Sequence, residues 1–149
     1  MTIEIDVQYA VDADGLPTVA DFRRWAAAAL EDRSAAELAV RVVDREESRR
    51  LNGTYRGKDA PTNVLSFPAE LPPGVDLPLL GDIVICAPLV GEEARSQHKR
   101  VMDHWAHLTV HGVLHLLGFD HGNDDDAAEM EALETRILLK LGCADPWRA

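Results

Sequence analysis

Hydrophobic and polar positions alternate along several short stretches of the chain. In residues 3–9 every second side chain is apolar, and residues 38–42 follow the same pattern. A period of two is typical of a β-strand with one buried face. Short apolar runs at 64–67 and 82–87 predict two further strands. The stretch 69–80 between them holds three prolines and a glycine, which predicts a surface loop.

Helical spacing of apolar residues marks other parts of the chain. Thr18, followed three residues later by Asp21, has the pattern of a capping box and predicts a helix start. Asp44 suggests the start of a second helix, and the pair at 52–53, Asn-Gly, suggests its end.

The second half of the chain is mainly helical in pattern. From Pro88 to Leu117 apolar residues keep helical spacing, with a break expected near 96–99. The acidic run at 124–126 suits a helix N-terminus, because carboxylates are stabilised at the positive end of the helix dipole. Gly142 is expected to end this last helix.

Strands early and helices late, with some alternation, predict an α+β fold. We expect a small mixed β-sheet packed with several α-helices. The length of 149 residues fits one domain, residues 1–149. No apolar run approaches the roughly 18 residues of a membrane span, and the first residues have no signal-peptide pattern. Two cysteines without metal-ligand spacing fit a reducing compartment, so we expect a cytoplasmic protein.

Charge is unevenly distributed along the chain. The net charge of −11 opposes binding to nucleic acid, which requires Lys and Arg. Residues 41–58, however, hold six basic and three acidic side chains, whereas residues 120–134 hold seven acidic and no basic ones. The molecule is therefore either bipolar, with one basic face, or both runs are ordinary solvated helix faces.

Four of the six histidines lie within twelve residues, at the end of the long predicted helix. His111 and His115 are one turn apart, so both rings lie on one face of a helix. Gly118 would end that helix and allow His121 to return to the same place. Three imidazoles with an open fourth position are what catalytic zinc requires. The sequence therefore predicts one Zn²⁺ ion held by His111, His115 and His121, although other divalent transition metals suit the same ligands.

Two alternatives to this interpretation stay open. His107 lies on nearly the same helical stripe and could replace His121 as third ligand; otherwise His104 and His107 are surface groups or supports for the ligands. The spacing also matches that of metzincin proteases at the histidines and the glycine. Those proteases need Glu directly after the first histidine as general base, and Gly112 stands there instead.

Three blocks of sequence resemble the YbeY family of bacterial endoribonucleases. The first is HGVLHLLGFDH at 111–121. The second combines LN at 51–52, YRGK at 55–58 and PTNVLSF at 61–67, and the third is GDIVIC at 81–86. They occur in the family's order and cover roughly residues 50 to 121. Asn63 is a mild departure, since relatives often have Asp there, and the loop at 69–80 carries no family signal.

The resemblance implies a single-strand-preferring, metal-dependent endoribonuclease. Such proteins take part in 3′ maturation of small-subunit (16S) ribosomal RNA and in ribosome quality control. The expected partners are therefore single-stranded RNA and the small ribosomal subunit or its assembly factors. A metalloprotease-like hydrolase, suggested by the histidines alone, and a noncatalytic assembly factor with a structural metal are the competing functions.

The resemblance also implies that Arg56 is functional, which is physically reasonable because its planar guanidinium can hold a phosphate with two hydrogen bonds. We assign it a catalytic role in offsetting transition-state charge. Asp120 is a second catalytic candidate that could orient an imidazole or accept a proton. Lys58, Asn63 and Ser66 are candidate substrate-binding residues. The sequence identifies no general base.

Overall fold

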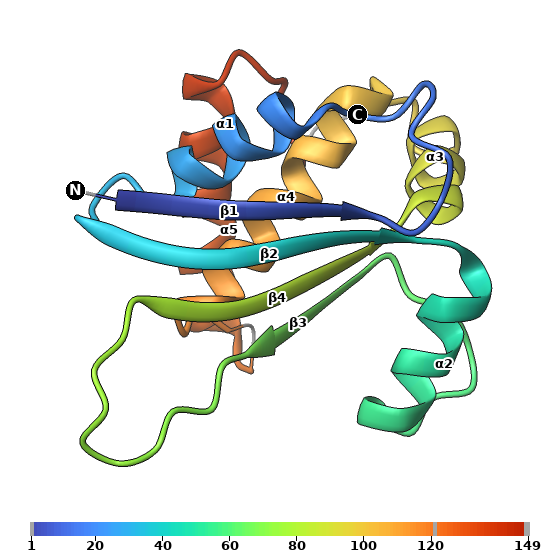
Figure 1. Cartoon of the computed structure of the whole chain (residues 1–149). Helices are drawn as coiled ribbons and strands as arrows, with labels where there is room; N and C mark the ends of the chain where they lie inside the picture. The colour runs from blue at the N-terminus through green and yellow to red at the C-terminus, as the bar shows by residue number, and fades with distance from the viewer. Residues whose placement is uncertain (1, 121, 148–149) are drawn as a thin grey trace.

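The computed structural model describes residues 2–120 and 122–147, and Figure 1 shows its helices packed around one sheet. The elements in chain order are β1 (Thr2–Tyr9), α1 (Val19–Ala29), β2 (Ala35–Val43), α2 (Arg45–Arg56), β3 (Val64–Pro68), β4 (Leu79–Cys86), α3 (Ala87–Ser96), α4 (Val101–Leu116) and α5 (Asp124–Lys140).

The four strands form one sheet in the order β1-β2-β4-β3. β1 pairs with β2 and β2 with β4 in parallel, whereas β3 pairs with β4 in antiparallel orientation and lies at an edge. The sheet is therefore mixed, and the predicted α+β fold is confirmed.

The two faces of the sheet are covered by different helices. Ile83 and Ile85 of β4 join the main core, which α1, α4 and α5 complete on one face. Their neighbours Val84 and Cys86 point to the opposite face and pack with residues of β2, β3 and α2. Since side chains alternate along a strand, α2 and α4 lie on opposite faces, with the edge strand β3 between them (Figure 1).

Most of the predicted boundaries are confirmed. Thr18 caps α1, and its hydroxyl and the Asp21 carboxylate form the reciprocal bonds of a capping box. The predicted break separates α3 from α4, and α5 begins at the acidic run. The expected end of the second helix at 52–53 is wrong: α2 continues to Arg56, and Gly57 caps it with a left-handed φ of 69°. β4 also begins at Leu79, inside the stretch predicted as loop.

Gly112 allows α4 to lie unusually close to the sheet. A Cβ at this position would lie 2.8 Å from Ile83 Cγ2, with two more Ile83 carbons within 3.2 Å. Ile83 is fully buried and branched at Cβ, so it has little room to move away. The Ser66 hydroxyl on β3 also donates to the Gly112 carbonyl. The backbone of α4 at Gly112, the residue after His111, therefore lies directly against side chains of the sheet.

Gly112→Ala should destabilise the fold despite the better helix propensity of alanine. Overpacking against Ile83 typically costs about 1–3 kcal/mol, which exceeds the ~1 kcal/mol that alanine gains over glycine in a helix. We expect a lower midpoint in urea or thermal unfolding. Gly53→Ala is the matched control, since a Cβ there meets only the Lys58 carbonyl at 3.6 Å on an exposed helix face. It should stabilise by up to ~1 kcal/mol. Equal effects of the two substitutions would contradict a close approach of α4 to Ile83 at Gly112.

Among the described residues, no helix combines the length and the apolar character that crossing a membrane requires.

Candidate metal centre

α4 arranges four histidines along one side of the helix. Centroid separations between successive imidazole rings are 6.2 Å for His104 and His107, 6.3 Å for His107 and His111, and 4.7 Å for His111 and His115. The predicted one-face pairing of His111 and His115 is confirmed. His104 and His107 are buried, whereas His111 and His115 are partly exposed towards the end of the helix. The accessible end of the row is thus the end that a substrate could reach.

α4 ends at Leu116, just before the glycine that the sequence suggests as its end. Gly118 adopts a left-handed φ of 101°, which glycine accepts without strain. Asp120 follows in an exposed position. His121, the third predicted ligand, lies outside the described residues. Its assignment as a ligand therefore remains a prediction.

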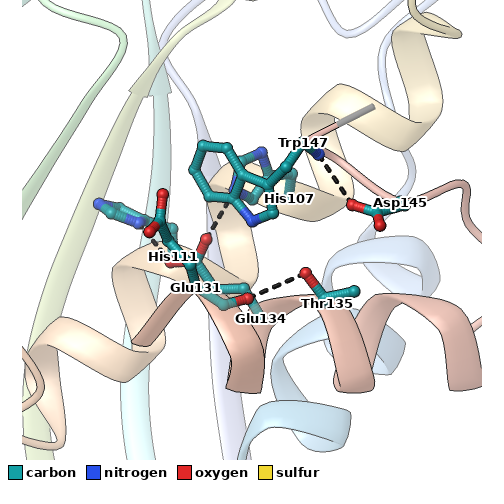
Figure 2. Close-up of polar contacts among 7 residues, drawn as sticks. All are labelled: His107, His111, Glu131, Glu134, Thr135, Asp145 and Trp147. Carbon is teal, nitrogen blue, oxygen red and sulfur yellow. Dashed lines mark hydrogen bonds and ion pairs between the residues drawn. The ribbon is translucent and has the colours of Figure 1, made fainter. Parts of the chain in front are cut away.

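A buried carboxylate on α5 binds two of the histidines. One Glu134 oxygen lies 2.8 Å from His107 Nε2, and the other lies 2.7 Å from His111 Nδ1 (Figure 2). The Glu134 side chain is 1% exposed. Burial by itself would raise the pKa of Glu134, but hydrogen bonds from His107 and His111 outweigh it and lower the pKa to about 2. The carboxylate is therefore ionised at neutral pH, in a place where an unpaired charge would be very costly.

His107, His111 and Glu134 form a group that could itself hold a metal ion. One ligand atom of each lies within 4.8 Å of the others. This places the competing ligand His107 beside the predicted ligand His111. The donor chemistry of the region, imidazole and carboxylate, suits zinc and other divalent transition metals. The structure thus supports a metal site around His111. The further ligands are either His115 and His121, as predicted, or His107 and Glu134.

The two basic candidates lie at the C-terminal end of α2 and just after it. Arg56 is the last residue of α2, and Lys58 follows the Gly57 cap; both are exposed. No hydrogen bond or ion pair joins either side chain to another of the described residues. α2, which carries Arg56, packs on the face of the sheet opposite α4.

The candidates Asn63 and Ser66 have contacts within the fold. The Asn63 amide donates to Glu93, whose carboxylate also lies 2.8 Å from His104 Nε2. The Ser66 hydroxyl donates to the Gly112 carbonyl at 3.2 Å. Asn63 thus connects the loop before β3 to the buried beginning of the histidine row. Ser66 lies beside the residue that follows His111.

Sequence reasoning missed the two carboxylates that bind the histidine row, Glu93 on α3 and Glu134 on α5. A signal for Glu134 was present. It falls on the stripe formed by Met130, Ile137 and Leu138, which the structure buries. A charged residue on an apolar helical stripe needs a partner in the core, and a buried histidine is a suitable one.

Two comparisons with known proteins bear on the family of this chain. The profile of the family described as Endoribonuclease YbeY matches residues 10–142. A protein of Alkalilimnicola ehrlichii named Endoribonuclease YbeY is 60% identical over 152 residues, covering 98% of this chain and 92% of the relative. The chain therefore belongs to the Endoribonuclease YbeY family.

A solved structure supports the fold alone. The solution structure of TM1509 from Thermotoga maritima superposes with a TM-score of 0.66 at 24% identity, covering 97% of this chain and 99% of that one. At this level of identity the likeness extends to the arrangement of helices and strands, and the site has to be argued from the residues of this chain.

Proposed function

We propose that this chain is a zinc-dependent endoribonuclease that cleaves single-stranded RNA. The observation that carries the proposal is the 60% identity to an Endoribonuclease YbeY over nearly the whole chain. By the same relationship we assign it to 3′ maturation of small-subunit (16S) ribosomal RNA and to ribosome quality control. Its partners would be that RNA and the small ribosomal subunit or its assembly factors, in the cytoplasm. Residues 1–149 would act as one metallohydrolase domain.

We assign the zinc ligands to His111, His115 and His121. Two ligands about 2.0–2.2 Å from one tetrahedral zinc lie roughly 3.3–3.6 Å apart. The Glu134 oxygens lie only 2.7 and 2.8 Å from the histidine nitrogens, which is hydrogen-bond spacing. This favours Glu134 as a partner of the histidines and disfavours it as a third ligand with His107. When bound, the ion would supply Lewis-acid polarisation of a phosphate oxygen.

Residues at the end of α2 and on the edge strand β3 would hold the RNA. Phe67 contacts Tyr55, the neighbour of Arg56, with ring centroids 5.0 Å apart. Ser66, the preceding residue on β3, faces α4. Neighbouring residues of β3 thus contact the C-terminal part of α2 on one face and α4 on the other. We assign Arg56 and Lys58 to phosphate binding, with Arg56 stabilising transition-state charge.

The polar candidates near the histidines have smaller assigned roles. Asp120, which is exposed and precedes the proposed ligand His121 in the sequence, would orient a ligand imidazole or accept a proton. Ser66 and Asn63 would contact the substrate where β3 meets α4. Their hydrogen bonds within the fold give both residues a structural role as well.

The test is cleavage of a single-stranded RNA by the purified protein before and after metal removal. We expect cleavage that a chelator abolishes and that zinc restores. Metal analysis of the same sample should give about one ion per chain. RNA binding without turnover, at full metal occupancy, would instead support a noncatalytic assembly factor with a structural metal.

Hydrolysis of peptides should be undetectable. The metzincin base would have to stand at position 112, where glycine packs against Ile83. The measurement is release of fragments from unfolded casein at the protein concentration that cleaves RNA. Chelator-sensitive casein cleavage would contradict the prediction and favour the protease-like alternative.

A further inference from the structure

Glu134 stands between two histidines as a shared hydrogen-bond acceptor. Its two oxygens engage His107 Nε2 and His111 Nδ1 separately, at 2.8 and 2.7 Å (Figure 2). An ionised carboxylate only accepts hydrogen bonds, so each of these ring nitrogens must carry the hydrogen. The shared carboxylate therefore imposes a definite protonation site on both rings.

This constraint decides which nitrogen of each ring can bind a metal. A neutral imidazole has one N–H and one lone pair. With its hydrogen on Nδ1, His111 carries the lone pair on Nε2, the nitrogen on the other side of the ring. With its hydrogen on Nε2, His107 cannot offer that nitrogen to an ion shared with His111. The same carboxylate thus prepares His111 as a ligand and keeps His107 Nε2 from being one.

We propose that Glu134 is a positioning residue that fixes His111 in the Nδ1–H tautomer and directs its Nε2 towards the metal, with His107 as the second support of the carboxylate. This inference rests on the proposed metal-dependent function. Carboxylate–histidine–metal arrangements are a general means of orienting a ligand and increasing its basicity.

The surroundings of Glu134 fit such a role. The carboxylate is 1% exposed, so water does not compete for its lone pairs. On the outer side, Trp147 packs against the His107 ring with centroids 5.1 Å apart, as Figure 2 shows. The C-terminal segment thus covers the support while the His111 side of the row stays partly open. A group needed only for packing would be better served by an apolar side chain, because a buried charge is expensive.

The first measurement needs no variant. Long-range ¹H–¹⁵N NMR of the metal-free wild type identifies which ring nitrogen of each histidine is protonated. We expect Nδ1–H for His111 and Nε2–H for His107. An Nε2–H tautomer for His111 would overturn the proposal.

The second measurement is zinc affinity of Glu134→Gln, by competition with a chromophoric chelator. The amide keeps the shape but offers one accepting oxygen and one donating nitrogen, so it cannot accept from both rings. We expect zinc to bind about 10- to 100-fold more weakly, with the Nδ1–H preference of His111 weakened. Glu129→Gln is the matched control, with the same charge change at an exposed position of α5, and it should bind zinc like the wild type.

The outcomes separate this proposal from the proposed function. Unchanged zinc affinity in Glu134→Gln would refute the positioning role and leave a metal-dependent ribonuclease intact. A wild type that binds no divalent metal would refute the proposed function and with it the metal role of Glu134. Should Glu134→Gln not fold, the ring tautomers of the wild type decide alone, and an Nε2–H tautomer for His111 refutes the proposal.

Discussion

Replacing His115 by alanine is expected to empty the metal site and abolish RNA cleavage. The His115 ring meets the His111 ring edge to face, with centroids 4.7 Å apart, at the accessible end of the row, and His115 is one of three proposed ligands. Losing one of three ligands should weaken zinc binding by more than the roughly 10- to 100-fold attributed to groups that merely support ligands. The measurement is zinc per chain after dialysis against a weak chelator, alongside the cleavage rate on a single-stranded RNA.

His107→Ala is the control for His115→Ala, because both remove an imidazole from α4. It should retain zinc and most of its activity, with a loss of stability from the buried cavity and from the Glu134 oxygen that loses its His107 partner. His121→Ala should behave like His115→Ala. If His107→Ala loses its metal and His121→Ala keeps it, the ligands are His107, His111 and Glu134 instead.

Arg56→Ala should lower the rate of cleavage far more than the affinity for RNA. Its exposed guanidinium has no ion-pair partner among the described residues, so it is available for a phosphate. Removing one preorganised contact to a transition-state charge typically costs about 10²–10³ in rate. Single-turnover cleavage at saturating protein, measured with RNA affinity and zinc content, separates the two effects. Folding and zinc content should not change, since the side chain packs little.

Arg50→Ala is the matched control for Arg56→Ala, since Arg50 is an exposed arginine on the same helix. It should weaken binding modestly and flatten its salt dependence, as loss of one phosphate contact does. Arg49 is a poorer control, because it is already paired with Asp59 at 2.6 Å. If Arg56→Ala lowers affinity and leaves the bound-state rate unchanged, Arg56 is an electrostatic anchor without a catalytic role.

Local patterns in the sequence were enough for most of the fold. The capping box at Thr18 and the break between α3 and α4 are signalled by neighbouring residues, and both are confirmed. The helix end after Arg56 was missed because Asn52 looked like a terminating residue. In the structure Asn52 is buried and its amide donates to the Ala60 carbonyl. Asn52 is therefore held inside the helix by a contact with the following loop, and the helix continues to Arg56.

The site was predictable only where it is local in sequence. His111 and His115 are four residues apart on one helix, so their pairing follows from helix geometry alone. Glu134 is 23 residues from His111 on another helix, and its role depends on how α4 and α5 pack. The acidic run around it suggested a solvated face, which is right for the exposed residues 124–126 and wrong for Glu134.

The contact between Gly112 and Ile83 also limits which substitutions at position 112 evolution can accept. A glutamate at position 112 would bring the ligand frame one step nearer a peptidase, yet its Cβ alone would collide with a branched side chain in the core. The single substitution that alters the chemistry is therefore also one that damages the fold. Room for the glutamate would require a smaller residue at position 83 first. An Ile→Ala substitution in a core typically costs about 2–5 kcal/mol of stability. Core packing thus requires more than one substitution between a ribonuclease and a peptidase of this kind, although the spacing of their histidines is the same.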